Sequence, residues 1–464
     1  MNNGFTIIEP GIGQWRSADI DADELPVALR FHESVAISPL EAVFDARVTN
    51  VDHALDMAFL DLGNGLMGAL NFRRARLLVK GQVGGIGDCV QEGQALRVQV
   101  IAEPSSIEDG KALSVSVRPR VTGRYLVAET GGARLNFSKD LPPRTLKALK
   151  EDLSPFAANA AIIVRSRAVD IEPAAVLAEA KRLTKALSSP VGEPGLVFSY
   201  SEAERALLTA PDSDLPIMIE GGSFAADVKK LAKSQWPDLL PRIKGYDGKN
   251  AFEELGVNES IEESLADRID LPSGGWISIT PTPAMTVVDV NMGSALKHMN
   301  AGEAKLVVNM EATMAIAHHL QFQDIGGLIV VDYIDMSGKG HARELMQLIE
   351  RTMREDRVPV QHTGISTFGL VEFTRKRSGL SLRDRMQRQR TPVARDMATA
   401  LDTLQKAQAA GLSAEPGKLV IKLPQNAMSW LITNDSLLDA LEASTQRQLD
   451  ISPGEKTEVY IRHD

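Results

Sequence analysis

The sequence predicts a multidomain α/β protein with a small β-barrel, and three observations support this prediction. The chain has 464 residues and 44% of them are hydrophobic, which is enough for several cores. Short strand-like runs separated by Gly-rich turns follow one another between residues 40 and 119, a spacing typical of a small barrel. Residues 277–335 form a strand, helix and strand pattern, which favours neighbouring strands in one sheet.

The segments on either side of the barrel have the pattern of α/β structure. Residues 5–37 contain three short strand-like runs, too little sheet for an independent core, so we expect them to join later segments. Residues 120–200 contain the runs GRYLVAE and AAIIVRSRAVD and a helix from about Pro173 to Ser188. Residues 201–265 have a helix, strand and helix pattern. Residues 391–464 contain a helix, the strand KLVIKLP, a helix from about Ser436 to Leu449 and the strand TEVYIRH.

Composition restricts the possible classes of protein. The net charge of −10 argues against a wholly basic nucleic-acid coat, although it is compatible with a local basic groove. The single cysteine, Cys89, excludes a disulfide framework and a multi-cysteine zinc site within one chain, so no zinc is expected. Neither a signal peptide nor a membrane span is recognisable, and we expect a soluble, cytoplasmic protein. The sequence also lacks a GxxxxGK[ST] loop and an HExxH motif.

Polar side chains end both strands of the segment from Ile277 to Asp335. The run TVVDVN ends with Asp289 and Asn291, which share one face of an extended strand, and Asp332 lies near the end of the run GLIVVDYID. If the strands are neighbours, these side chains meet at one sheet edge, where hard oxygen ligands suit Mg²⁺ or Mn²⁺. The alternative is that these residues begin turns or cap helices.

Longer motifs in the same region resemble the catalytic core of the bacterial ribonuclease E/G family. They occur in the family's order and are LPSGGWISI, TVVDVN, NMEAT, DIGGLIVVDYIDM and FGLVEFTRKR, with weaker similarity back to about Phe44. Motifs this long, spread over roughly a hundred residues, are poorly explained by chance.

The resemblance implies a division into domains. It predicts RNase H-like and DNase I-like α/β subdomains, an inserted S1-type (OB-type) barrel and a small C-terminal α/β domain. The expected boundaries are 1–38 and 201–265 for the RNase H-like parts, 39–119 for the barrel, 120–200 for a 5′-sensor-like region, 266–390 for the catalytic DNase I-like domain and 391–464 for the small domain. The sequence lacks the CPxC zinc knuckle of many members, but a homodimer through the small domain is still plausible.

The resemblance also implies a function, which is Mg²⁺-dependent endonucleolytic hydrolysis of single-stranded RNA in RNA processing or decay. The products would carry 5′-phosphate and 3′-hydroxyl ends. Asp289 and Asp332 would hold the ion, and Asn291 would orient the aspartate or a metal-bound water. Asp335 is a weaker candidate, and a family Glu is replaced by Pro283. Two alternatives stay open: a non-catalytic RNA-binding or regulatory protein on the same scaffold, and a metal-dependent phosphatase for small substrates.

Phe59 matches a position at which the family's barrel keeps an aromatic ring for stacking RNA bases. A place in the barrel core is an equally good interpretation of this residue. A second aromatic and a lysine of the family correspond to Ala69 and Ala102, and both changes predict weaker RNA binding by the barrel.

Arg165 and Ser166 match a pair that binds the 5′-monophosphate of RNA in the family, and Gly123 and Val127 match the backbone lining of that site. A further family arginine corresponds to Pro359. The alternative for Arg165 is a solvated charge at the end of a strand.

A basic run lies between Phe373 and Arg390 and contains a single acid, Asp384. Such a run can neutralise phosphates and hold RNA beside a metal, although it could also be a soluble linker. We expect RNA contacts, above all from Arg375 and Lys376. The other basic residues of the run are Arg377, Arg383, Arg385, Arg388 and Arg390.

Overall fold

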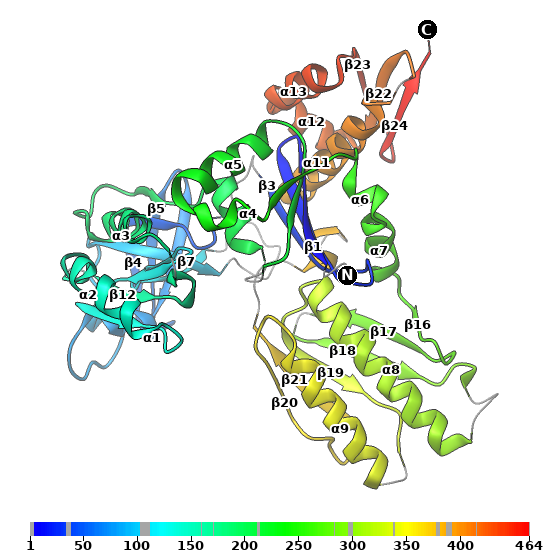
Figure 1. Cartoon of the computed structure of the whole chain (residues 1–464), viewed down its shortest axis with the longest axis horizontal. Coiled ribbons are helices and arrows are strands. Elements are labelled where there is room, and N and C mark those ends of the chain that lie inside the picture. Colours follow the sequence, from blue (N-terminus) through cyan, green and yellow to red (C-terminus); the bar gives the residue numbers. More distant parts are fainter. Residues whose placement is uncertain are drawn as a thin grey trace. The chain divides into compact units, whose positions relative to one another are not determined.

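A computed structural model describes residues 4–33, 39–102, 112–158, 160–169, 171–210, 214–282, 284–295, 300–336, 339–376, 381–386, 392–413 and 415–463. They form two compact units, which are Met1–Phe31 with Tyr246–Asp464 (the first unit) and His32–Gly245 (the second unit). Both units combine helices with sheets, which confirms the predicted mixed α/β class (Figure 1). Within the described residues, no helix has the length and apolar character needed to cross a membrane.

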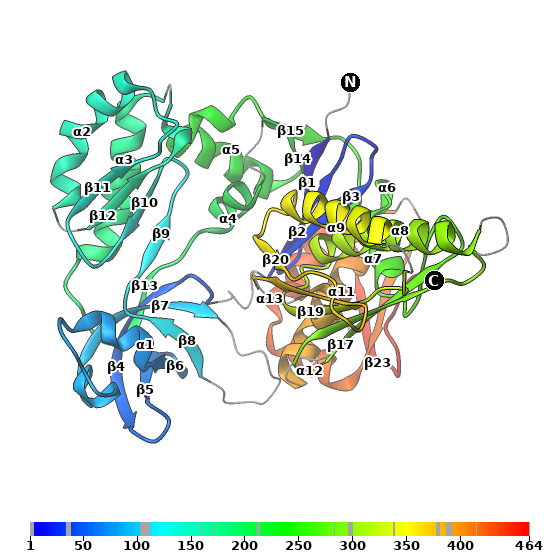
Figure 2. The same ribbon diagram turned by 90° about the horizontal axis from the view of Figure 1, so that it is seen from below.

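The second unit contains the predicted barrel. Its strands are β4 (Val43–Asp52), β5 (Met57–Gly63), β6 (Leu66–Asn71), β7 (Ala95–Ala102) and β8 (Leu113–Ser116), in the order β4-β5-β6-β8-β7. Pairing of β7 with β4 closes the barrel, and β13 (Gly195–Phe198) adds to the other edge of β4 (Figure 2). The loops carry α1 (Phe72–Ala75), η1 (Arg76–Leu78) and η2 (Ile86–Asp88). Alternate residues of β5 fill the interior, as expected for a pleated strand with one buried face.

A second sheet of this unit has the order β11-β12-β10-β9. Its strands are β9 (Arg120–Thr122), β10 (Leu126–Glu129), β11 (Arg134–Phe137) and β12 (Ala161–Val164), and its helices are α2 (Pro143–Ala157) and α3 (Pro173–Ser188), with η3 (Ser166–Ala168) between β12 and α3. The unit ends with α4 (Glu202–Thr209), β14 (Ile217–Glu220), α5 (Ser223–Gln235), η4 (Pro237–Leu239) and β15 (Ile243–Tyr246). The RNase H-like and DNase I-like assignments and the domain boundaries stay predictions.

The first unit is built around a six-stranded sheet with the order β16-β17-β18-β19-β21-β20. The strands are β16 (Ile269–Asp270), β17 (Trp276–Pro281), β18 (Thr286–Asn291), β19 (Gly327–Asp332), β20 (Val360–His362) and β21 (Leu370–Arg375). The parallel strands β18 and β19 are joined by α8 (Ala301–Phe322), as the strand, helix and strand pattern predicts. Helix α9 (Lys339–Arg354) follows, and both helices cover the same face of the sheet (Figures 1 and 2).

The sequence alternation explains why this sheet has one buried and one open face. In β18, Val288 and Val290 are buried in a core that includes residues of α8 and α9, whereas Val287 and Asp289 are exposed. Strand β19 repeats the pattern in register, with Val331 buried. The polar ends of both strands therefore lie on the open face, opposite the helices.

The rest of the first unit consists of smaller elements. They are β1 (Phe5–Gly11), β2 (Gln14–Ile20), β3 (Pro26–Glu33), α6 (Ala251–Glu254), α7 (Val257–Ser264) and α10 (Leu382–Met386). At the C-terminal end, α11 (Pro392–Gly411), α12 (Gln425–Thr433) and α13 (Ser436–Thr445) accompany a sheet of β22 (Lys418–Leu423), β23 (Leu449–Pro453) and β24 (Glu458–Arg462). Helix α13 is shorter than the sequence predicts, and β23 is a strand that the prediction missed.

Candidate active site

The structure brings Asp289 and Asp332 together at the end of two neighbouring strands. They are direct register partners in the parallel pair β18–β19, and both side chains are exposed on the open face. Neighbouring strands lie about 4.8 Å apart, so the two carboxylates project side by side. Asp335, three residues further on, is also exposed.

Asn291 fixes the orientation of one of these carboxylates. Its Nδ2 donates a hydrogen bond of 2.7 Å to Oδ2 of Asp289, from the same face of the same strand. The side chain of Asn291 is half-buried, and Asp289 is exposed. This hydrogen bond is compatible with orienting the aspartate, and both roles predicted for Asn291 stay predictions.

The donor set suits a hard divalent cation. Among the described residues, neither Asp289 nor Asp332 forms an ion pair, so both carboxylates have oxygens available to a ligand. No cluster of three or more His, Cys, Asp or Glu side chains suited to a metal occurs in the part of the chain that the structure describes. A pair of carboxylates still fits Mg²⁺, which usually keeps several waters and takes one or two protein carboxylates plus substrate phosphate.

Helix α8 supports the pair through residues that the sequence reasoning did not assign. Asn309 is fully buried; its Nδ2 donates to the carbonyl of Ile334 at 2.9 Å, and its Oδ1 accepts from the amide of Ile334 at 3.0 Å. One turn later, Thr313 lies 3.0 Å from the hydroxyl of Tyr333. These contacts hold the backbone that follows Asp332. The sequence motif NMEAT could have indicated this role, because it places Asn309 and Thr313 four residues apart, on one face of the helix.

The turn before β17 supports the end of β18. The amide of Ser294 donates to the carbonyl of Gly274 at 2.9 Å. Gly293 has a φ of +51°, and a Cβ there would lie 2.1 Å from the same carbonyl, so this close approach requires glycine. Glu311 of α8 accepts from the amide of Ser273 at 2.9 Å. The SGG motif is therefore packed against the residues that follow Asn291.

Arg375 lies in the interior rather than on a surface that RNA can reach. Its side chain is 3% exposed. Its Nε donates to Asp356 at 2.9 Å, and its Nη1 donates to Asp324 at 2.8 Å and to the carbonyl of Ile325 at 3.1 Å. The guanidinium thus joins three segments of the first unit, and this placement does not support the predicted RNA contact.

The remaining described residues of the basic run differ in exposure. Lys376 is exposed, as an RNA contact requires. Arg383 is buried and donates to the carbonyls of Leu265 and Ala266, and Arg385 lies over the ring of Phe31 with its Cζ 5.2 Å from the centroid. The other members of the run, Arg377, Arg388 and Arg390, fall outside the described residues, as does Pro283.

Phe59 lies on the outer face of the barrel. Its neighbours in β5, Ala58 and Leu60, are buried in the barrel core, and Phe59 itself is half-buried and outside that core. The alternative placement in the core therefore does not hold. Its cross-strand partner on β6 is Ala69, so the ring faces a methyl group where the family has a second aromatic.

The residues predicted to hold a 5′-phosphate lie close together in the second unit, and hydrogen bonds within the protein already connect several of them. Nη1 of Arg165 donates to the carbonyl of Gly123 at 2.8 Å, and Ser166 is exposed at the start of η3. Val127 is 4% exposed, and its backbone lies in the β10 ladder with β12 and β9. Ser166 also lines a cavity of about 250 Å³ with Arg124, Arg167, Val169, Ile171, Asp214, Asp238 and Arg242.

A buried carboxylate, Glu179, organises this region and was not predicted. It accepts from the amides of Arg124, Tyr125 and Leu126 at 2.8–2.9 Å and from the indole of Trp236 at 2.8 Å. Burial raises the pKa of Glu179, while these hydrogen bonds lower it. A Cβ at position 123 would lie 2.3 Å from the carboxyl carbon, so Gly123 is required by Glu179 itself.

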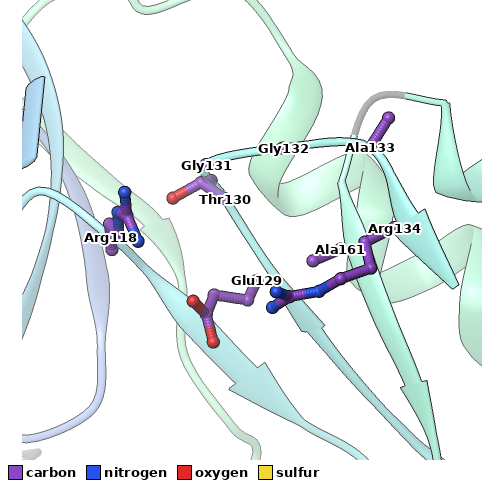
Figure 3. A pocket seen from close by; sticks show the side chains of 8 residues that line it. All are labelled: Arg118, Glu129, Thr130, Gly131, Gly132, Ala133, Arg134 and Ala161. Carbon is purple, nitrogen blue, oxygen red and sulfur yellow. The ribbon is translucent and has the colours of Figure 1, made fainter. Parts of the chain in front are cut away.

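A second cavity of this unit, of about 200 Å³, lies at the turn that connects β10 to β11 (Figure 3). Arg118 and Arg134 approach it from two sides, and Glu129 lies between them (Figure 3). The Gly131–Gly132 turn forms its rim. The mixed charge gives this cavity no clear preference for an anion.

A sequence model of the ribonuclease E/G family matches residues 120–378. Ribonuclease G of Escherichia coli (strain K12) is 28% identical over 360 residues, covering 73% of each chain. Ribonuclease G of Haemophilus influenzae is 30% identical over 363 residues, again 73% of each chain. Ribonuclease E of Nostoc sp. is 29% identical over 386 residues, which are 77% of this chain and 53% of the relative.

Proposed function

Because the chain belongs to the ribonuclease E/G family, we propose that it is a metal-dependent endoribonuclease acting on single-stranded RNA in RNA processing or decay. The observation that carries this proposal is the register pair Asp289 and Asp332, with Asn291 bonded to Asp289, in the segment that the family model covers. The open face of the sheet gives an RNA strand access to this pair, and a cytoplasmic location fits such a substrate.

The roles of the residues follow from their placement. Asp289 and Asp332 would hold Mg²⁺ or Mn²⁺, and Asn291 keeps the Asp289 carboxylate turned toward that position. When bound, a divalent ion supplies a nucleophile at neutral pH and offsets negative charge on the phosphodiester. Asn309 and Glu311 hold the backbone beyond the two strand ends, so the carboxylates are positioned before substrate binds. The expected products carry 5′-phosphate and 3′-hydroxyl ends.

The test is cleavage of a short A/U-rich single-stranded RNA with and without Mg²⁺. The wild-type protein should cut it, EDTA should stop the reaction, and Asp289→Ala or Asp332→Ala should reduce the rate at least about 100-fold because a metal ligand is lost. The matched control is Glu372→Gln, which removes another exposed carboxylate of the same sheet face and should leave the rate near that of wild type. Cleavage that persists in EDTA would refute the metal mechanism.

The second candidate is a non-catalytic RNA-binding or regulatory protein. The observation that favours it is Ala69 opposite Phe59, which leaves the outer face of the barrel with one aromatic ring at this pair. Binding of several RNAs without any cleavage in Mg²⁺ or Mn²⁺ would support this candidate over the nuclease.

A further inference from the structure

Trp276 lies on the same open face as the carboxylate pair. It is the cross-strand partner of Asn291 in the β17–β18 ladder, and Ser278, two residues on, is the partner of Asp289. Residues two apart on a strand are about 6.8 Å apart along the strand direction. The indole therefore lies one such step along the sheet and one strand across from Asp289, and one further strand from Asp332, so a nucleotide next to the one at the carboxylates can reach it.

The indole is half-buried, and the guanidinium of Arg268 lies over one face of its ring. Cζ of Arg268 lies 5.2 Å from the ring centroid, and Arg268 itself is 57% exposed. Its partner Asp270 is 73% exposed, so this ion pair, at 2.6 Å, is in contact with solvent and weak. An arginine that stacks on a ring at the surface can be displaced by another planar group, and the guanidinium can then turn to a phosphate.

The backbone under Trp276 is held by hydrogen bonds of the preceding turn and by close packing on α8. The amide of Leu271 donates to the carbonyl of Gly275 at 2.8 Å, and the amide of Gly274 donates to the carbonyl of Leu271 at 2.9 Å. A Cβ at position 275 would lie 2.7 Å from a methyl carbon of Val308 in α8, so the turn is packed directly on the helix. A ring on such a support loses little freedom when a ligand stacks on it.

We propose that Trp276 and Arg268 form a nucleobase-binding subsite for a nucleotide that flanks the phosphodiester held at Asp289 and Asp332. The base stacks on the indole, and Arg268 contacts the neighbouring phosphate. Stacking tolerates any base because every base has a π-face, so this subsite adds affinity and register without strict sequence preference. The proposal rests on the proposed ribonuclease function, since it concerns the same RNA strand.

The test uses tryptophan fluorescence and RNA affinity in EDTA, where no cleavage is expected. The chain has four tryptophans; Trp15 and Trp236 are buried, and Trp430 is half-buried on α12. A pentanucleotide RNA should quench wild-type fluorescence. Trp276→Ala should weaken binding by roughly 5- to 150-fold and abolish the quench. Trp276→Phe should keep most of the affinity but lose the quench, and Trp430→Phe should keep both.

A second arm separates stacking from a general loss of structure. Removing one base at a time from the pentanucleotide should weaken wild-type binding most at one position next to the cleavage site. The Trp276→Ala variant should bind this abasic RNA and the complete RNA with equal affinity. If Trp276→Ala binds and is quenched like wild type while the protein still cleaves RNA in Mg²⁺, the subsite is refuted and the ribonuclease function stands. If wild-type protein binds no RNA under any condition, both proposals fail.

Discussion

Two neighbouring basic residues, Arg375 and Lys376, have opposite environments. Arg375 is 3% exposed and donates to Asp324 and Asp356, whereas Lys376 is exposed. Because the guanidinium of Arg375 is buried, removing it would leave the carboxylates of Asp324 and Asp356 without their cation and with little access to water. The sequence shows both residues as members of one basic run and does not distinguish them.

The two residues should therefore respond differently to substitution. Arg375→Gln should lower the free energy of unfolding by about 3–5 kcal/mol, measured by urea denaturation. Lys376→Ala should leave stability unchanged and reduce the dependence of log K for RNA on log[salt] by about one unit of slope, because one phosphate contact is lost. Equal RNA affinity and salt dependence in Lys376→Ala and wild type would remove Lys376 from the RNA interface.

Asn309 is a residue whose effect on activity is expected to be indirect. Asn309→Ala leaves the amide and carbonyl of Ile334 without their buried partner and should destabilise the protein by about 1–3 kcal/mol. The cleavage rate constant should fall while the KM for RNA changes little, since Asn309 positions the backbone after Asp332 and contacts no substrate. A change confined to KM would contradict this positioning role.

At the level of single elements, helix α8 forms part of the core that covers the buried face of the sheet. Ten of its residues, including His319, are buried. Burial, together with the charges of His318 and Arg383, lowers the pKa of His319 to about 4. The unfolded chain has an ordinary histidine, with a pKa near 6.5.

This shift gives stability a pH dependence with a defined sign. Below about pH 6.5 His319 is protonated in the unfolded state but stays neutral in the folded state. The free energy of unfolding therefore decreases as pH falls from about 6.5 to about 4. The loss should approach about 3 kcal/mol at the acid end. Urea denaturation at pH 7.5 and pH 4.5 should show a smaller acid loss for His319→Gln than for wild type. An identical loss in both proteins would show that His319 titrates normally in the fold.

The sheet elements show what can be predicted from sequence and what cannot. The alternation in TVVDVN and GLIVVD, with a helix between them, predicts parallel neighbours, and the structure has Asp289 and Asp332 in register. Local periodicity carries that information. The burial of Arg375 depends on Asp324 and Asp356, which are 51 and 19 residues away in sequence, and no local pattern reveals such a pairing. Glu179 was missed for the same reason, because its backbone partners lie 53–55 residues away.

For the whole molecule, catalysis is proposed for the first unit, and recognition of an RNA 5′-end is a prediction for the second. Arg165 and Ser166 lie together at the end of β12, next to the backbone nest that Glu179 fills. An RNA with a 5′-monophosphate should be cleaved faster than the same RNA with a 5′-hydroxyl. Arg165→Ala should abolish this difference without slowing cleavage of the 5′-hydroxyl RNA, since that RNA has no terminal phosphate for the guanidinium to bind; the variant also loses the hydrogen bond to the carbonyl of Gly123, so its fold should be checked by circular dichroism. No difference between the two RNAs in wild type would show that the region does not sense the 5′-end.

The claim on which the rest depends is that Asp289 and Asp332 share one divalent ion. The most direct measurement is anomalous X-ray scattering from a crystal soaked in Mn²⁺. We expect one peak between the ends of β18 and β19, within coordination distance of both carboxylates, and its loss in Asp289→Asn. Full Mn²⁺ occupancy elsewhere on the protein, with none at this pair, would contradict the account.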